Sequence, residues 1–207
     1  MNESPQSPLS APFWDTRYES SEFVFGTNPN DFLKESTPKL AKGSVILCLG
    51  EGEGRNAVFL AKQGFSVTAV DMSIVGLQKA SRLAQEHSVS INTQVADLAQ
   101  FEFCENCWNG IISIFCHLPP EIRPHVYQKV VKALKPGGFF ILEAYTPRQL
   151  AYKTGGPSNP AMLYELEDLR TDLAGLEMII AEEKIREIHE GSAHSGNASV
   201  VQILARK

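Results

Sequence analysis

A short apolar run that ends in alternating glycines constrains this chain more than any other feature. Residues 44–49 read SVILCL, and the chain continues at once with GEGEG over residues 50–54. An apolar run of this length without polar alternation is typical of a strand buried on both faces. A helical pattern follows from Arg55 to Gln63 and ends at Gly64, which suits a C-cap. Strand, glycine-rich turn and helix together predict the first unit of an α/β sheet.

Strand-like and helix-like patterns alternate along the rest of the chain. The further expected strands are 65–70, 91–96, 111–115 and 139–144. The expected helices are one capped by Ser73, with Ile74, Leu77, Ala80, Leu83 and Ala84 on its buried face, and two more near 120–134 and 163–173. Two closing β-like segments, 177–190 and 198–205, are joined by the short stretch 191–197 and should pair antiparallel. We therefore predict one α/β domain, doubly wound and Rossmann-like, with a mostly parallel sheet and helices on both faces.

The charge composition and hydropathy of the chain disfavour some classes of binding partner. The 207 residues carry 19 basic and 24 acidic side chains, a formal net charge of -5, and no basic cluster longer than a pair. Nothing therefore predicts binding to nucleic acid or to an anionic membrane. No apolar run reaches the ~18 residues that span a bilayer, and the first residues, MNESPQSPLSAPF, lack the features of a signal peptide. We expect a cytoplasmic protein, monomeric or weakly dimeric, that acts on a small molecule.

The N-terminal part divides into two segments. Residues 1–12 are rich in Ser and Pro and are expected to form a flexible terminus, so that one domain spans residues 13–207. Residues 13–40 interleave aromatic and polar side chains, and Asn28-Pro29-Asn30-Asp31 predicts a helix start with Pro at the first helical position. Trp14 and Tyr18 are four residues apart and share a helix face. We expect this segment to cover the open ends of the strands as a lid; the alternative is a helix packed outside the sheet.

The cysteines give no scaffold of disulfides. Four in a chain of this length are expected to be free thiols in a reducing compartment. Cys104 and Cys107 form a lone C-x-x-C, which supplies only two of the four ligands of a structural zinc site and lacks the strand-to-helix context of a redox motif. We expect a plain loop and no metal site there.

Ligands of an open α/β sheet bind beyond the carboxyl ends of its strands, so the chemistry should lie there. The glycines of the first turn remove every Cβ where backbone must approach a ligand, although such a turn alone is also compatible with a ligand-free bend. Asp71 follows the second strand 21 residues after Gly50 (71 - 50), near the spacing of a carboxylate that binds ribose hydroxyls. Asp97 ends the third expected strand. The pattern predicts a cofactor that contains adenosine.

The charges of the turn select among such cofactors. NAD, NADP and FAD place a pyrophosphate at this point, which Glu51 and Glu53 would repel. The third glycine of G-x-G-x-x-G is also missing, because position 55 is Arg55. A cofactor with a sulfonium and an ammonium suits an acidic turn, and that cofactor is S-adenosylmethionine.

The chain resembles a known family at these motifs. The run from Val45 to Gly54, together with Asp71, Asp97 and the segment LKPGG at 134–138, is similar to the successive motifs of class I S-adenosylmethionine-dependent methyltransferases. The segments WDTRY at 14–18 and FGTNPN at 25–30 resemble, more narrowly, the branch with tellurite-resistance and thiopurine methyltransferases. The resemblance covers nearly everything after residue 12. It implies a seven-stranded sheet that closes with an antiparallel hairpin.

The resemblance also implies how the cofactor is held. The glycines of the turn would line its methionine part, Asp71 would bind the ribose, and Asp97 with Leu98 would contact the adenine. The implied cofactor-binding residues are Trp14, Arg17, Tyr18, Gly50, Glu51, Gly52, Gly54, Asn56, Asp71, Met72, Asp97, Leu98 and Phe115. One position departs from the family pattern, because Cys48 stands where an acid is usual. Either Glu51 takes over the task of that acid, or the affinity is lower.

Residues after the fourth and fifth strands are candidates for the acceptor side. His117 could take a proton from the acceptor, orient it, or only cap the strand through a backbone bond. Tyr145 and Arg148 are candidate substrate contacts at the same edge of the sheet, the mouth formed by the carboxyl ends of the strands, with His194 nearby in the last hairpin. We expect a methyltransferase for a small acceptor with a soft or anionic nucleophile. The alternatives are a nucleotide-dependent oxidoreductase and a non-catalytic module that binds the cofactor.

Overall fold

The computed structural model describes residues 10–207 and shows a single seven-stranded sheet. Its strand order is β3-β2-β1-β4-β5-β7-β6. The strands are β1 (Val45–Leu49), β2 (Ser66–Asp71), β3 (Asn92–Val95), β4 (Trp108–Ile114), β5 (Leu134–Tyr145), β6 (Glu177–Glu190) and β7 (His194–Arg206). The first five pair in parallel, and β7 runs antiparallel to both β5 and β6. This confirms the predicted fold class and the antiparallel closing pair.

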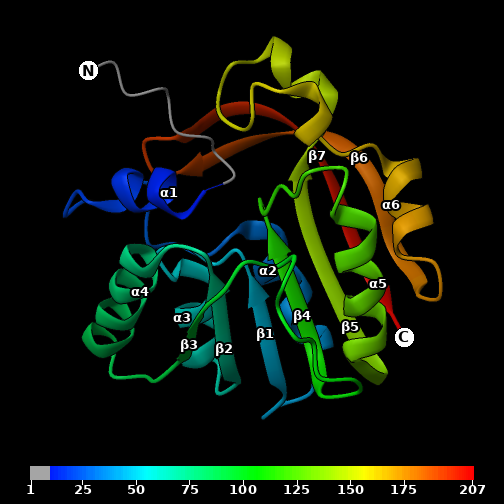
Figure 1. Cartoon of the computed structure of the whole chain (residues 1–207), viewed down its shortest axis with the longest axis horizontal. Coiled ribbons are helices and arrows are strands. Elements are labelled where there is room, and N and C mark those ends of the chain that lie inside the picture. Colours follow the sequence, from blue (N-terminus) through cyan, green and yellow to red (C-terminus); the bar gives the residue numbers. More distant parts are fainter. Residues whose placement is uncertain (1–9) are drawn as a thin grey trace.

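Helices cover both faces of the sheet (Figure 1). The α-helices are α1 (Ala11–Tyr18), α2 (Asp31–Ser36), α3 (Arg55–Lys62), α4 (Ile74–Glu86), α5 (Arg123–Ala133) and α6 (Leu166–Asp172). Three short 3-10 helices, Thr37–Lys39, Pro147–Ala151 and Pro160–Met162, lie in the connections. Apolar residues of α2, α3 and α4 pack on one face of the sheet, and those of α5 and α6 pack on the other. The sheet is therefore buried on both sides, as its apolar strands require.

Several boundaries differ from the predicted ones, each for a local reason. β3 has only four residues, all exposed, because it is an edge strand, so Asp97 follows two residues after it. Ile74 opens the first turn of α4 and is 50% exposed, so it does not belong to the buried face of that helix. Asn30 is the N-cap of α2 and accepts a hydrogen bond from Leu33 N–H, which leaves Pro29 before the helix rather than inside it.

The closing hairpin is longer than the sequence predicted. β7 begins at His194, so the turn between β6 and β7 has only three residues, Gly191 to Ala193. The stretch 194–197 pairs with β6 instead of forming a loop. At the tip, Ser192 N–H donates to the carbonyl of Val24 over 3.1 Å. The hairpin therefore reaches across the carboxyl ends of the strands to the N-terminal segment, as the arch above α1 in Figure 1 shows.

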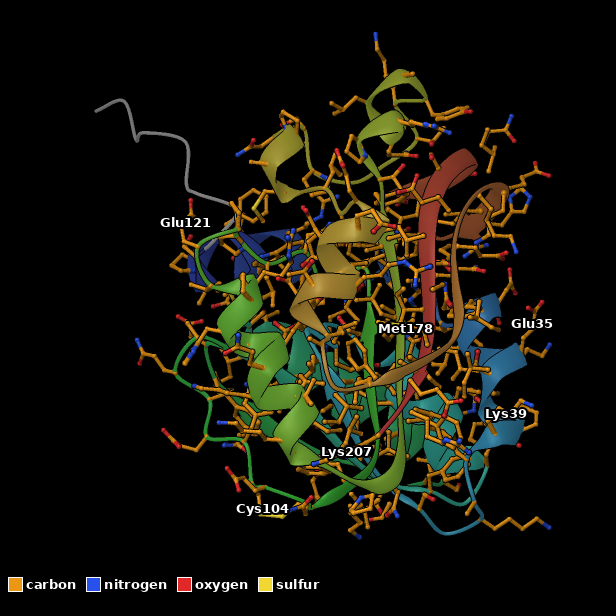
Figure 2. The ribbon with its side chains drawn as sticks, turned by 90° about the vertical axis from the view of Figure 1, so that its right-hand side faces the viewer. Glu35, Lys39, Cys104, Glu121, Met178 and Lys207 are labelled. Carbon is orange, nitrogen blue, oxygen red and sulfur yellow. A yellow bond between two sulfur atoms is a disulfide. The ribbon has the colours of Figure 1, made fainter. Side chains whose placement is uncertain are left out.

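The C-x-x-C pair lies far from this edge of the sheet. Cys104 and Cys107 form a disulfide in the loop before β4, with Cα atoms 5.6 Å apart, so the expectation of four free thiols is wrong for this pair. The loop places the two Cα atoms within the reach of a disulfide, which is the physical reason for the difference. Cys48 and Cys116 are free. In Figure 2, Cys104 lies at the bottom of the molecule, well below Glu121, which belongs to the loop after the carboxyl end of β4, so the disulfide is remote from that end of the strand.

The expected flexible terminus lies largely outside the described residues, and α1 already begins at Ala11. Within residues 10–207, no helix combines the length and the hydropathy of a transmembrane segment.

Candidate functional site

The turn after β1 is shaped by a close backbone contact. Gly52 has a φ of +59°, and a Cβ at this position would lie 2.7 Å from the hydroxyl oxygen of Tyr18. A side chain at 52 is therefore excluded both by backbone strain and by space. Tyr18 comes from α1 and is buried over the turn. The sequence predicted glycine here for close approach, and the structure shows that α1 makes part of that approach.

Glu51 occupies the N-terminus of α3. Its Oε1 accepts hydrogen bonds from Ala57 N–H over 2.7 Å and from Asn56 N–H over 3.0 Å. These are the N–H groups that would otherwise attract a phosphate to the helix. Burial raises the pKa of the Glu51 carboxyl to about 7, and its charge and hydrogen bond in turn contribute to the raised pKa of the buried Cys48 thiol. Glu51 thus lies next to Cys48, the position at which an acid is usual in the family.

Glu53 does not face the mouth as the charge argument assumed. Its carboxylate forms an ion pair of 2.5 Å with Lys79 Nζ of α4, and both side chains are buried. Lys79 Nζ also donates to the carbonyls of Ser20 and Glu22, each over 2.7 Å. Glu53 is therefore neutralised and helps to anchor the segment that follows α1. Of the two acids, only Glu51 would therefore repel a pyrophosphate at this turn.

Asp71 lies at the end of β2, directly beside the turn. Gly52 N–H donates to its Oδ2 and Ser73 N–H donates to its Oδ1, each over 2.8 Å. Burial raises the pKa of this carboxyl, while the backbone hydrogen bonds act in the opposite direction. Each carboxylate oxygen accepts one of these bonds and keeps further acceptor capacity. Met72 is the next residue along the chain.

Asp97 and Leu98 lie in the loop after β3, at the same edge of the sheet. Asp97 is exposed and its Oδ1 accepts a hydrogen bond from Ala99 N–H over 2.9 Å. Leu98 is buried against the core. Together they present a carboxylate beside an apolar side chain at the far end of the mouth from Glu51.

Only the first part of the segment 13–40 lies at this edge: α1 is attached across it, whereas α2 packs on a face of the sheet, so the expected lid does not extend to residue 40. Asp15 Oδ1 accepts hydrogen bonds from Ser73 Oγ over 2.6 Å and from Val75 N–H over 3.3 Å, which fixes α1 to the start of α4. The ring of Trp14 stacks on that of Tyr18 with centroids 5.6 Å apart. Arg17 is exposed and its guanidinium lies 5.6 Å from the centroid of Phe25.

The other glycines and Asn56 of the predicted set have mainly local contacts. Asn56 turns its side chain to Asn30, whose N–H donates to Asn56 Oδ1 over 3.0 Å. A Cβ on Gly50 would lie 2.5 Å from the sulfur of Cys116, and one on Gly54 would lie 2.5 Å from the Cβ of Ala80. These positions therefore bring the turn close to the end of β4 and to α4.

His117 has no free ring nitrogen. Its Nδ1–H donates to the carbonyl of Met162 over 2.8 Å, and its Nε2 accepts from Tyr145 N–H over 3.3 Å. Burial lowers the pKa of the imidazole to about 4. Both nitrogens thus hold backbone of neighbouring segments, which favours the capping role over proton abstraction.

Tyr145 and Phe115 meet above the ends of β4 and β5. Phe115 follows β4 with a φ of +51°, and its ring lies 4.5 Å from that of Tyr145. A bulky residue with a left-handed backbone is uncommon and marks a constrained site. Arg148 is exposed in the 3-10 helix after β5.

A buried ionic network joins elements that are distant in sequence, and sequence reasoning missed it. Arg55 Nη2 lies 2.6 Å from Glu190 Oε2, and Asn30 Nδ2 donates to Glu143 over 2.8 Å and to Glu190 over 2.9 Å. Arg186 pairs with Glu143. The only available signal was the presence of acids inside otherwise apolar strands, such as Glu143 in β5. The network ties α3, the N-terminal segment and the hairpin together.

The geometry suits a cationic cofactor at the first turn. A carboxylate at the N-terminus of α3 and a second carboxylate at Asp71 match a molecule with an ammonium, a sulfonium and ribose hydroxyls. A pyrophosphate would have to displace Glu51 from its two N–H donors. The residues present therefore fit S-adenosylmethionine better than a dinucleotide.

Comparison with known proteins agrees with this fit. Residues 46–138 match the family described as a methyltransferase domain. A relative from Mycobacteroides abscessus, 2-heptyl-1-hydroxyquinolin-4(1H)-one methyltransferase, is 27% identical over 60% of this chain and 56% of that protein. Thiopurine S-methyltransferase from Legionella pneumophila is 24% identical over 77% of this chain and 78% of that protein. The chain spans about half the length of the first of these relatives.

A solved structure gives the same fold. TehB from Haemophilus influenzae superposes with a TM-score of 0.71 over 95% of this chain and 66% of that chain, at 19% sequence identity. At this identity the likeness concerns the fold alone. The fold, the matched domain and the acidic turn all favour a domain that binds S-adenosylmethionine.

Proposed function

We propose that this chain, whose residues 46–138 match a methyltransferase domain, is a class I S-adenosylmethionine-dependent methyltransferase and that it methylates a small molecule whose nucleophile is soft or anionic. When bound, the cofactor supplies an electrophilic methyl group on a sulfonium. The observation that carries the proposal is the carboxylate of Glu51 at the N-terminus of α3, which favours a cationic cofactor over a phosphorylated one. The two relatives named above are both methyltransferases of small molecules by name, which supports an acceptor of that size.

We assign the cofactor-binding roles by position. Glu51 would pair with the ammonium group of the cofactor. Asp71 would accept hydrogen bonds from the ribose through its remaining acceptor capacity. Asp97 and Leu98 would contact the adenine. Phe115 and Tyr18 would limit access of water to the reacting centre.

The state of His117 supports a soft or anionic acceptor. Its pKa of about 4 and its two backbone partners make it a poor base at neutral pH. A nucleophile that is already ionised, such as a thiolate, needs no base in the transition state. Orientation and exclusion of water then supply most of the rate. His117 would act by holding the loop that contains Met162 against β5.

We also propose that the N-terminal segment is a lid. Tyr18 covers the turn, Asp15 is bonded to the start of α4, and Lys79 holds the carbonyls of Ser20 and Glu22. These contacts lie outside the two large core clusters, so the segment would be able to release and close without disturbing them. Closure after binding would keep the sulfonium away from bulk water.

The test is transfer to matched acceptors. The purified chain is incubated with S-adenosylmethionine and with benzenethiol, phenol or benzyl alcohol, and S-adenosylhomocysteine is measured by mass spectrometry. We expect product above the protein-free rate with the thiol and little with the alcohol, and Asp71→Ala should lose it. Turnover of the alcohol but not of the thiol would contradict the proposed acceptor class. Absence of any product with the three acceptors, together with absence of cofactor binding, would contradict the proposed activity.

A further inference from the structure

The tip of the β6–β7 hairpin meets the N-terminal segment in a contact that is too close for a side chain. A Cβ on Gly191 would lie 2.3 Å from the carbonyl oxygen of Val24 and 2.5 Å from the backbone nitrogen of Gly26. Gly191 also has a φ of +68°, a backbone conformation that favours glycine. Both the backbone conformation and the available space therefore require glycine at this tip.

Backbone hydrogen bonds hold the same two segments together. The N–H of Ser192 donates to the carbonyl of Val24 over 3.1 Å, and the N–H of Ala193 donates to the same carbonyl over 3.4 Å. We call this contact the clasp, and it consists of Val24, Phe25 and Gly26 on the N-terminal side and Gly191, Ser192 and Ala193 on the hairpin side. In Figure 1, the hairpin that carries the second side arches over α1. The clasp therefore joins segments from opposite ends of the sequence.

Phe25 connects the clasp to α1 and to the turn after β1. The centroid of its ring lies 4.6 Å from that of His194, the first residue of β7, and 6.4 Å from that of Tyr18. The N–H of Phe25 donates to Glu53 Oε2 over 3.4 Å, and Glu53 belongs to the turn. One residue of the clasp thus contacts the hairpin, α1 and the turn.

The residue before the hairpin side of the clasp is tied to the same turn. Glu190 Oε2 accepts a hydrogen bond from Arg55 Nη2 over 2.6 Å, and Arg55 is the first residue of α3, directly after the turn. This ion pair is buried, whereas Gly191 and Ser192 beyond it are exposed. A fixed base and an exposed tip suit a short segment that moves about Glu190.

The clasp itself has little apolar packing. None of its six residues belongs to the hydrophobic clusters of the described part of the chain. Its N-terminal side is half-buried rather than buried. Segments with few buried apolar contacts and accessible backbone hydrogen bonds open locally at a low cost in free energy. We therefore expect the clasp to open while the sheet stays folded.

We propose that the clasp opens and closes as one unit, so that the hairpin tip is the second half of the lid over the turn after β1. The inference rests on the proposed function and adds to it the way in which access to the turn is controlled. In the closed state, Phe25 holds α1 and Tyr18 over Gly52, and exit of a ligand from the turn is slow. In the open state, the tip no longer holds Val24, and α1 is retained mainly by its contacts with α4. Occupation of the turn and closure of the hairpin tip are then thermodynamically linked.

The first part of the test is hydrogen exchange of the wild type with and without S-adenosylhomocysteine, measured by mass spectrometry. We expect the ligand to protect residues 189–195 of the hairpin together with residues 11–26. Residues 102–107, which are remote from the mouth, should not respond. Protection of residues 11–26 without protection of 189–195 would overturn the proposal, because the two sides would then move independently. Protection of neither segment by bound ligand would overturn it as well.

The second part separates the two sides of the clasp. In Gly191→Ala the new Cβ would collide with the backbone at Val24, so the tip must move away from the N-terminal side. We expect S-adenosylhomocysteine to dissociate about 10-fold faster from this variant, because lost contacts of this kind act mainly on the dissociation rate. The ligand should also no longer protect residues 189–195.

Gly43→Ala is the matched control. Gly43 has a similar φ of +73°, but a Cβ there would meet nothing within 4 Å. The variant therefore has comparable backbone strain without a collision, and it should release the ligand like the wild type. An equal release rate in Gly191→Ala, Gly43→Ala and the wild type would overturn the proposal.

A second pair of variants keeps the test decisive if Gly191→Ala does not fold. Phe25→Ala removes the ring that lies against His194 and Tyr18, and it should also speed release of the ligand and reduce protection of residues 189–195. Phe23→Ala removes another half-buried ring of the same segment, which lies 5.0 Å from Lys79 Nζ of α4. This control should leave the protection of residues 189–195 unchanged. A purely structural role of the clasp would lower the melting temperature of Phe25→Ala without changing its release rate, which would overturn the proposal.

The outcomes separate this inference from the proposed function. If the wild type fails to bind S-adenosylhomocysteine, the proposed function fails and this inference fails with it. If the wild type binds the ligand but Gly191→Ala and Phe25→Ala behave like their controls, only this inference fails.

Discussion

Arg55 and Glu190 lie 135 positions apart in the chain and form a buried ion pair of 2.6 Å. Arg55 is the first residue of α3, directly after the cofactor turn, and Glu190 ends β6 beside the tip of the hairpin. Asn30, from the N-terminal segment, donates to the same carboxylate. A single side chain thus links the three parts of the molecule that surround the mouth.

Removing one partner of this pair should destabilise the fold strongly. Arg55→Met leaves the Glu190 carboxylate buried without its main cation, and such losses cost about 3 to 5 kcal/mol. Arg206 and Glu177 form an ion pair of the same 2.6 Å length, but both side chains are largely exposed. Arg206→Met should therefore cost less than about 1 kcal/mol. Urea denaturation of both variants measures the difference, and equal losses would contradict the structural importance of the buried pair.

Glu51 should make cofactor affinity depend on pH. Its pKa of about 7 means that much of the carboxyl is protonated at pH 6 and ionised at pH 8. Because the ionised form attracts a cationic cofactor, the affinity for S-adenosylmethionine should rise from pH 6 to about 7.5, below the range in which an α-amino group titrates. Glu51→Gln should weaken binding about 10-fold at pH 7.5 and flatten the profile. A profile unchanged by this substitution would remove Glu51 from the site.

Ionisation of Glu51 should strengthen cofactor binding but lower the stability of the fold. The pKa of Glu51 is raised from 4.5 to about 7 in the folded protein, so its ionisation is less favourable there than in the unfolded chain. Without cofactor, the protein should therefore lose stability as pH rises from about 4.5 to 7. Glu51→Gln keeps an oxygen to accept the N–H bonds of α3 and avoids that cost. Its unfolding free energy at pH 8 should equal or exceed that of the wild type.

His117 should matter for structure more than for proton transfer. His117→Ala removes the bonds to Met162 and Tyr145 and should cost about 1 to 3 kcal/mol of stability. Turnover of a thiol that is ionised at the working pH should fall less than about 10-fold, because no proton is abstracted by this residue. With S-adenosylmethionine at saturation, so that Glu51 does not contribute, the kcat/KM for the thiol should have the same pH profile in His117→Ala as in the wild type. A loss of about 10²-fold or more in a folded variant would identify His117 as the base after all.

The lid should respond to the cofactor. Asp15→Ala removes the bonds to Ser73 and Val75 and should raise hydrogen exchange in residues 11–26 without changing exchange in β1 or β4. Added S-adenosylmethionine should protect this segment in the wild type and less in the variant. Glu19→Ala, an exposed change in the same segment, serves as the control. Exchange that ignores the cofactor in the wild type would mean that the segment is a fixed part of the fold.

The buried strands and the cofactor turn were predictable because their signals are local. The apolar run before Gly50 and the spacing to Asp71 lie within some twenty residues, and parallel pairing brings their ends together without further information. The edge strand β3 was harder to delimit, since all of its side chains are exposed. Contacts between distant segments gave no such signal. The partners of His117 lie 28 and 45 residues away, and the partner of Arg55 lies 135 away.

The acidic turn favours a cationic cofactor as predicted, but only one of its two acids contributes. Glu51 and Glu53 are both acids in the same turn, and the sequence alone gives them equal weight. The structure separates them, because Lys79 of α4 neutralises Glu53 whereas Glu51 caps α3. Such pairing depends on how α4 packs against the turn, which no local pattern encodes.

The most direct test of the account is calorimetric titration of the purified chain with S-adenosylmethionine and, separately, with NAD. The account predicts binding of S-adenosylmethionine in the micromolar range, no heat from NAD, and a loss of about 10-fold or more in Asp71→Ala, which removes a charged acceptor for the ribose. Tight binding of NAD, or an affinity for S-adenosylmethionine that ignores the loss of Asp71, would contradict it.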